Sequence, residues 1–219
     1  MALVLCLPAL LADTLTVTSV NPSGAHLGGV YTGPYVGTIN GVAGIEIICD
    51  DYQTSTSLNT QFYVTETKVS ELTGPDPNQV VKFNRDNYAE QQSNYMTAAY
   101  LAIQLIGVDQ STAAGRLQAS LLNYAIWGIF YADALNSLTT SQKSAAEAYL
   151  VDAQSAVSFQ TVDKYSSVSI WTPTPNSAAQ EFLSVRVPEP STIGVLAGHA
   201  FVLVILGLFL RRRGFRLTD

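Results

Sequence analysis

The most constraining feature of the sequence is an uncharged run near its carboxyl end. Residues 192–210, TIGVLAGHAFVLVILGLFL, contain no Asp, Glu, Lys or Arg. A helix of these 19 residues is roughly 28 Å long, close to the thickness of the hydrocarbon core of a bilayer. A helix buried in a globular protein is rarely apolar on every side. The run therefore predicts a single transmembrane helix over residues 192–210.

A cluster of arginines sets the expected orientation of this helix. Arg211, Arg212 and Arg213 follow it directly, and Arg216 is nearby. Positively charged residues stay on the cytoplasmic side of a membrane. We therefore expect residues 211–219 in the cytoplasm and the body of the chain outside it.

A proline motif with the sequence VPEPST occupies residues 187–192, directly before the uncharged run. Its candidate recognition residues are Val187, Pro188, Glu189, Pro190 and Ser191. Two prolines hold the backbone extended, which is the conformation that a processing enzyme can bind. The order of motif, spanning helix and arginine cluster resembles the PEP-CTERM sorting signal of Gram-negative bacteria. The resemblance implies that an exosortase, a membrane-embedded cysteine protease-transpeptidase, recognises the tail and cuts near the motif.

The amino end carries a second targeting signal. Residues 2–12 form an apolar run of signal-peptide length, and Ala12 precedes a plausible cleavage point. No Lys or Arg precedes the run, so either the leader is atypical or the true start lies upstream. We expect a signal peptide at 1–12, an extracytoplasmic domain at 13–186 and a sorting tail at 187–219. Removal of the leader would remove Cys6 and leave Cys49 without a disulfide partner.

The charge of the chain is distributed unevenly. Four of its 11 basic residues, but only one of its 17 acidic residues, lie between residues 211 and 219. The rest of the chain has a net charge of about −9, from seven basic and 16 acidic residues. This acidity argues against nucleic acid as a partner, because nucleic-acid binding needs a basic surface.

The hydrophobic periodicity of the body predicts an α+β fold. Residues 14–68 alternate and carry turn signals such as Asn40-Gly41, which is typical of strands, including strands at 44–52 and 61–68. After an expected loop at 72–84, helical spacing predicts helices at 88–106, 112–131 and 139–158. We expect Leu117 of the second helix to be buried, and the first helix to have an apolar stripe of Tyr95, Ala98, Ala99, Ala102 and Leu105. Strand character returns at 167–171 and 181–185, with a turn or tether at 172–177 between them. We expect N-terminal strands in a sandwich or barrel-like sheet, a three-helix insertion and returning C-terminal strands.

The body offers little for catalysis. His26 is its only histidine, and neither a nucleophile elbow, a phosphate loop nor a dinucleotide fingerprint is present. One histidine and one cysteine are too few for a zinc site. Asp50 and Asp51 could bind calcium, or could be a solvated or hydrogen-bonding strand end. We expect no enzyme activity, no cofactor and no metal.

Three segments of the body form a further pattern: Cys49-Asp50-Asp51, a helical Ala-Ala-Tyr-Leu at 98–101, and Asn123-Tyr-Ala-Ile-Trp at 123–127. Their order resembles a group of PEP-CTERM exoproteins and, more distantly, the thioester domains of Gram-positive adhesins. The resemblance implies a bond between the cysteine and a glutamine side chain. Asn123 occupies the glutamine position and Gln118 lies upstream, so Cys49 with either is the candidate pair. Core packing of the aromatic residues explains the same helix.

These features together predict an exported cell-surface or matrix protein, tethered at the inner membrane with its body in the periplasm and then processed. The family resemblance implies association with exopolysaccharide and biofilm. The alternative is a surface adhesin with an internal thioester at Cys49, and a further one is a secreted hydrolase that depends on His26.

Overall fold

The computed structural model describes residues 12–20, 25–75, 79–83 and 86–186. The sorting tail and nearly all of the expected signal peptide lie outside these ranges. Within them, no helix is both long enough and apolar enough to cross a membrane.

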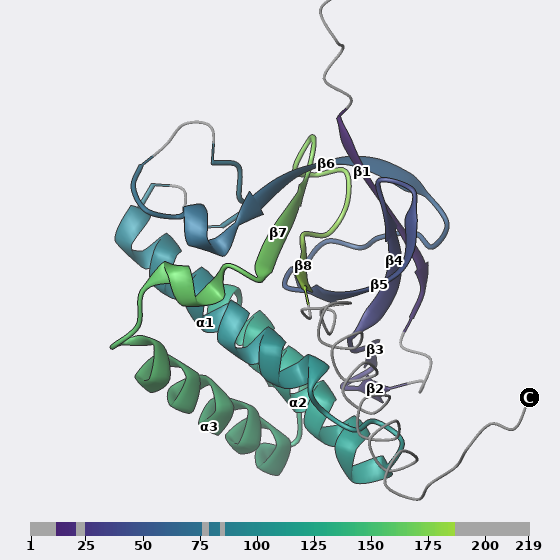
Figure 1. Ribbon diagram of the computed structural model, residues 1–219. Helices are drawn as coiled ribbons and strands as arrows, with labels where there is room; N and C mark the ends of the chain where they lie inside the picture. Colours follow the sequence, from purple (N-terminus) through teal and green to yellow (C-terminus); the bar gives the residue numbers. More distant parts are fainter. Residues whose placement is uncertain (1–11, 21–24, 76–78, 84–85, 187–219) are drawn as a thin grey trace, which may run out of the picture. The chain divides into compact units, whose positions relative to one another are not determined.

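A closed six-stranded barrel forms one half of the body (Figure 1). Its strands, all antiparallel, follow one another around the barrel in the order β1, β4, β5, β8, β7 and β6. Their bounds are Asp13–Ser19 for β1, Tyr35–Ile39 for β4, Val42–Cys49 for β5, Phe182–Val185 for β8, Val168–Pro173 for β7 and Gln61–Lys68 for β6. The short strands β2 (His26–Leu27) and β3 (Val30–Tyr31) pair separately. Of the two expected sheet arrangements, the structure has the barrel.

The last two strands complete the barrel. After β6 the chain leaves the sheet for the helices and returns as β7 and β8, which lie between β6 and β5. Closure leaves no barrel edge unpaired, and this removes the usual template for edge-to-edge aggregation. Thr172 and Pro173, expected in a turn, instead end β7, because they pair with Thr65 and Val64 of β6.

Local sequence signals explain the elements well. Asn40 and Gly41 both have positive φ angles, 50° and 82°, between β4 and β5. Such angles match the two-residue hairpin turns that Asn-Gly favours, so this predicted turn is confirmed.

Three helices follow, and each begins at a capping side chain. They are α1 (Tyr88–Ile106), α2 (Ala113–Phe130) and α3 (Thr140–Val157), as predicted to within a residue or two. Asn87, Thr112 and Thr139 accept hydrogen bonds from backbone N–H groups in the first turns of α1, α2 and α3. These caps satisfy donors that the helices cannot pair internally.

Helices α1 and α2 lie between the barrel and α3, as Figure 1 shows. Tyr95, Ala98, Ala99, Ala102 and Leu105, the predicted stripe of α1, are all buried. Tyr124, Ile126 and Trp127 of α2 are also buried, which confirms them as core residues. The prediction for Leu117 was wrong: it is 43% exposed, because most of the first two turns of α2 face solvent.

Leu122 and Leu117 of α2 provide a matched test of this packing. We expect Leu122→Ala to lower the free energy of unfolding by about 2–5 kcal/mol, because it leaves a cavity at a fully buried position. Leu117→Ala should cost under about 1 kcal/mol, since its side chain is already partly in water. Urea unfolding followed by tryptophan fluorescence measures both changes, and equal losses would contradict the assigned packing.

Candidate functional site

The end of β5 places three chemically distinctive residues in the interior. Cys49 is the last residue of β5, and Asp50 and Asp51 follow it. All three are completely buried. Because a carboxyl group loses hydration energy on burial, each aspartate needs a partner or a proton. Of the expected solvated or hydrogen-bonding strand end, the solvated form is therefore wrong, whereas Asp51 is hydrogen-bonded.

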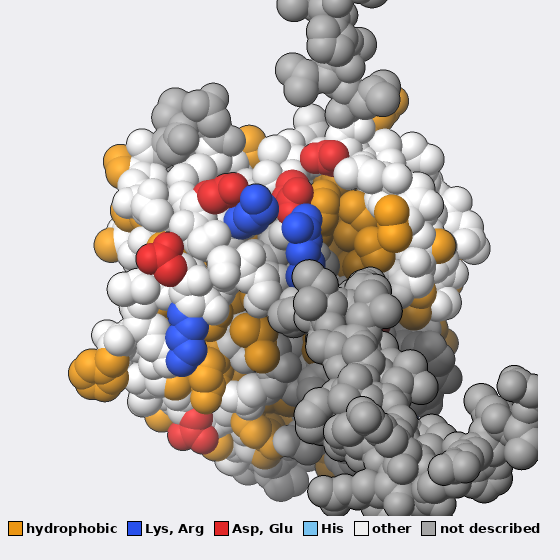
Figure 2. Space-filling view, in the orientation of Figure 1, with side chains coloured by type: hydrophobic (Ala, Val, Ile, Leu, Met, Phe, Trp, Pro, Cys, Tyr) orange, Lys and Arg blue, Asp and Glu red, His pale blue; other side chains and the backbone are white. Residues whose placement is uncertain are grey.

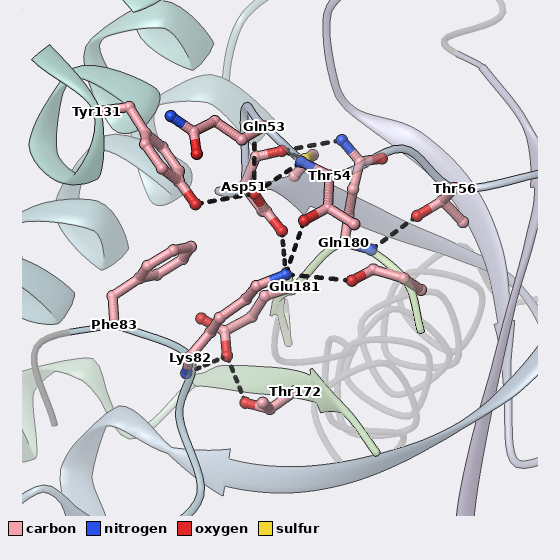
Figure 3. Close-up of polar contacts among 12 residues, drawn as sticks. Asp51, Gln53, Thr54, Thr56, Lys82, Phe83, Tyr131, Thr172, Gln180 and Glu181 are labelled. Atoms are coloured by element: carbon pink, nitrogen blue, oxygen red, sulfur yellow. Dashed lines mark hydrogen bonds and ion pairs between the residues drawn. The ribbon is translucent and has the colours of Figure 1, made fainter. Parts of the chain in front are cut away.

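Asp51 forms a buried ion pair with Lys82, a residue of the segment between β6 and α1 (Figure 3). The Lys82 ammonium contacts Asp51 Oδ2 and also donates to Thr54 Oγ1 at 2.9 Å and to the Ala179 carbonyl at 3.3 Å. Asp51 Oδ1 accepts from the backbone N–H groups of residues 53 and 54 and from the Tyr131 hydroxyl, each at 3.2 Å. Every part of this ion pair is hydrogen-bonded, as burial requires.

The same contacts keep Asp51 charged. Burial acts to raise the pKa of its carboxyl group, but hydrogen bonds from Lys82 and Thr54 outweigh that effect and hold the pKa below its ordinary value. The negative charge of Asp51 thus persists inside the protein. Its carboxyl group is hydrogen-bonded to three separate segments of chain: residues 53–54, Lys82 and Tyr131.

Glu181 forms a second buried acidic group next to β8. Its Oε2 accepts from the Lys82 backbone N–H at 2.8 Å and from the Thr172 hydroxyl, and its Oε1 accepts from the Tyr95 hydroxyl. Burial is the main cause of the raised pKa of Glu181. These donors link the barrel strand β7, helix α1 and the Lys82 segment at one carboxyl group.

Asp50 behaves differently from Asp51. Among the described residues, its carboxyl oxygens have no hydrogen-bond donor, and the buried carboxyl group of Glu181 is a close neighbour. Burial, followed by the charge of nearby Glu181, raises the pKa of Asp50 well above its ordinary value. At pH values between its unfolded and folded pKa, the Asp50 carboxyl group therefore takes up a proton on folding.

The structure brings Cys49 together with Asn123 but not with Gln118. The Asn123 amide nitrogen donates to the Cys49 carbonyl at 3.0 Å, and Asn123 Oδ1 accepts from the Gly33 N–H at 2.6 Å. Gln118 is exposed on the outer face of α2. Burial raises the pKa of the Cys49 thiol, so the sulfur is not a thiolate at neutral pH.

A cleft of about 490 Å³ opens beside this buried network. Its aromatic lining residues are Tyr31, Tyr35, Tyr52, Trp127 and Phe182. Its polar lining residues are Gln53, Thr54, Ser55, Thr56 and Gln180. The cleft has the size usual for small-molecule sites.

Several expected sites have other outcomes. His26 is exposed on β2, and its ring packs edge-on against Tyr31 with centroids 5.3 Å apart. Within the part of the chain that the structure describes, no group of three or more His, Cys, Asp or Glu side chains is arranged to hold a metal. The sorting-motif residues 187–191 and the arginines 211–213 lie outside the described residues.

Lys82 and the cleft were missed by sequence reasoning. Lys82 lies in a segment expected to be a loop, where a lysine is usually exposed, and no local pattern marks it as the partner of a buried carboxylate. Only long-range pairing brings it to Asp51, 31 residues earlier in the chain.

Comparison with known proteins gives a structural match but no family. No protein-family model matches the chain, and no curated protein matches it. A solved structure that matches is the N-terminal thioester domain of fibronectin-binding protein SfbI from Streptococcus pyogenes. The two are 14% identical, the match covers 81% of this chain and 94% of that one, and the TM-score is 0.43. Similarity at this level establishes neither a common family nor a common activity.

The raised pKa of Asp50 predicts how the stability of the protein depends on pH. Because its pKa is raised on folding, its contribution to stability is complete below its unfolded pKa of about 3.9 and is lost as pH rises toward the folded value. Asp51, whose pKa is lowered, is ionised in both states above pH 5 or so and contributes no slope there. We expect Asp50→Asn to flatten the decline in stability as pH rises above about 5, by up to about 1.4 kcal/mol per pH unit.

Urea unfolding at a series of pH values measures this slope. The matched control is Asp152→Asn, which alters an exposed aspartate of α3. The assignment is contradicted when Asp50→Asn retains the slope of the unchanged protein.

Proposed function

We propose that this protein is a non-enzymatic cell-surface or extracellular-matrix protein that its C-terminal tail delivers through exosortase processing. The observation that carries this proposal is the uninterrupted order of proline motif, uncharged run and arginine cluster within residues 187–213. Each part alone is common. In this order, the uncharged run provides affinity for the membrane, and the arginines fix the orientation of the helix across it. The body is held in the periplasm at the inner membrane before processing and reaches the surface afterwards.

The position of the last strand supports processing at the motif. β8 ends at Val185, two residues before Val187, the first residue of the motif. It pairs with β5 on one side and β7 on the other, so the barrel is complete before the motif begins. A protease can therefore cut near Pro188 without opening the barrel.

The expected partner outside the cell is an exopolysaccharide. This expectation comes from the family resemblance of the tail. The visible face supports it, since Figure 2 shows acidic and basic side chains mainly near its upper middle, while the rest of this face is mostly uncharged polar and hydrophobic. Neutral polymers do not need the strong charge complementarity that nucleic acids require.

Changes in the motif test the sorting proposal. We expect Pro188→Ala with Pro190→Ala to block removal of the tail while the unfolding transition of the body stays unchanged, because both prolines lie beyond β8. Replacement of Arg211, Arg212 and Arg213 by glutamate should disturb the membrane orientation. C-terminal mass spectrometry of protein recovered from cells reports whether and where the tail is removed, and normal processing of both variants rejects the proposal.

A second candidate function is a covalent adhesin with an internal thioester. The observation that favours it is the Asn123 carboxamide beside Cys49, with the Gly33 N–H directed at its oxygen. Such a donor stabilises negative charge on that oxygen during attack by sulfur. The Cys49 sulfur would bond to the Asn123 side-chain carbonyl carbon. The amide nitrogen would leave as ammonia with the thiol proton.

Intact mass tests this second candidate. A thioester lowers the mass of the protein by one ammonia, and methylamine releases a free thiol on Cys49. Asn123→Ala should abolish the mass loss, whereas Gln118→Ala should retain it, because Gln118 is exposed. Full mass together with a thiol that titrates on unfolding excludes the thioester.

A further inference from the structure

None of the described residues that line the cleft beside the barrel carries a charged side chain. The chain outside residues 211–219 nevertheless has a net charge of about −9. The absence of cations from this lining disfavours anionic ligands, and the absence of carboxylates disfavours metals and amines. A neutral ligand is the remaining class.

The aromatic side chains of the cleft provide apolar faces at its floor and at its rim. Trp127 is 2% exposed and forms a packed floor, with its ring 5.3 Å from that of Tyr52. Tyr31 is 52% exposed at the rim, and its carbonyl accepts from the Tyr35 hydroxyl at 2.7 Å, which fixes its backbone. Tyrosine offers a flat apolar ring together with a hydroxyl, so it suits ligands that have both C–H faces and hydroxyl groups.

The polar wall of the cleft is held in place from below. The N–H groups of Gln53 and Thr54 both donate to the Asp51 carboxylate at 3.2 Å. Thr56 Oγ1 accepts from the Gln180 N–H at 2.9 Å, and Gln180 Nε2 donates to the Asp51 carbonyl at 2.9 Å (Figure 3). The buried ion pair therefore organises this wall before any ligand arrives, which reduces the entropic cost of binding.

These features favour one ligand class over the others. A purely apolar ligand would desolvate the amides and hydroxyls of the wall without replacing their hydrogen bonds. A neutral saccharide has hydroxyls for the wall and flat C–H faces for the tyrosines. We infer that this cleft binds one or a few sugar units of a neutral polysaccharide, with Tyr31 and Gln53 as contact residues. The inference rests on the proposed function only for the source of the polysaccharide.

Matched tyrosine variants test the inference. Tyr31 lines the cleft, whereas Tyr63 of β6 is similarly exposed, at 59%, but is not part of the lining. We expect Tyr31→Ala to weaken saccharide binding by about tenfold and Tyr63→Ala to leave it within about twofold. Gln53→Ala, another exposed position on the wall, provides an independent variant that removes a hydrogen-bonding group without touching the core.

Binding is measured by isothermal titration calorimetry on the full chain, purified in a detergent without sugar headgroups. The probes are neutral gluco-, manno- and galacto-oligosaccharides, with oligouronates as the anionic comparison. The expected result is binding of a neutral oligosaccharide that exceeds oligouronate binding and is lost in the cleft variants. Binding of none of the neutral probes, preference for oligouronates, or equal losses in Tyr31→Ala and Tyr63→Ala overturns the inference.

Failure of this inference can be told apart from failure of the proposed function. Calorimetry uses purified protein and does not depend on processing in cells. C-terminal mass spectrometry of the cellular protein does not depend on saccharide binding. A correctly processed protein with an inert cleft rejects only the binding site.

Discussion

The buried pair of Asp51 and Lys82 is the interaction on which the rest of the site depends. Its two charges join the end of β5, the segment before α1 and the residues that lead into β8. Removal of one member would leave an uncompensated charge in the interior, which is far more costly than the loss of a surface ion pair. Because Asp51 also anchors the N–H groups of residues 53 and 54, the interior charge determines the shape of a surface wall.

A charged carboxylate and an uncharged cleft lie close together in this molecule. Asp51 is fully paired and its pKa is lowered, the pKa of Asp50 beside it is raised, and the cleft above has an uncharged lining among the described residues. The pKa values of these adjacent aspartates shift in opposite directions, because Asp51 is hydrogen-bonded to an ammonium group, whereas Asp50 is buried and lies near Glu181. The surface then presents only hydroxyls, amides and aromatic rings to a partner.

Sequence patterns predicted the elements better than the site. The three helices and the 61–68 strand were placed almost to the residue, because their periodicity and capping residues are local signals. Barrel closure was left open against a sandwich, since it depends on pairing between β6 and β7, about 100 residues apart. Lys82 and Glu181 could not be foreseen as partners of the Cys-Asp-Asp segment for the same reason. Asn123 was placed beside Cys49 only by a motif resemblance, which gave no means of choosing it over Gln118.

Closure of the barrel by its final strands has a consequence for biogenesis. β4 and β1 pair with one edge of β5 and of β6, but the other edge of each strand stays free until residues 168–185 have been synthesised, because β8 and β7 cover those edges. Sheets built from such distant segments form slowly. If the chain is exported as proposed, the polypeptide can cross a translocon as an incomplete sheet, and the native state becomes available only after β7 and β8 have been made. The order of the strands would thus keep the chain export-competent until the barrel can close.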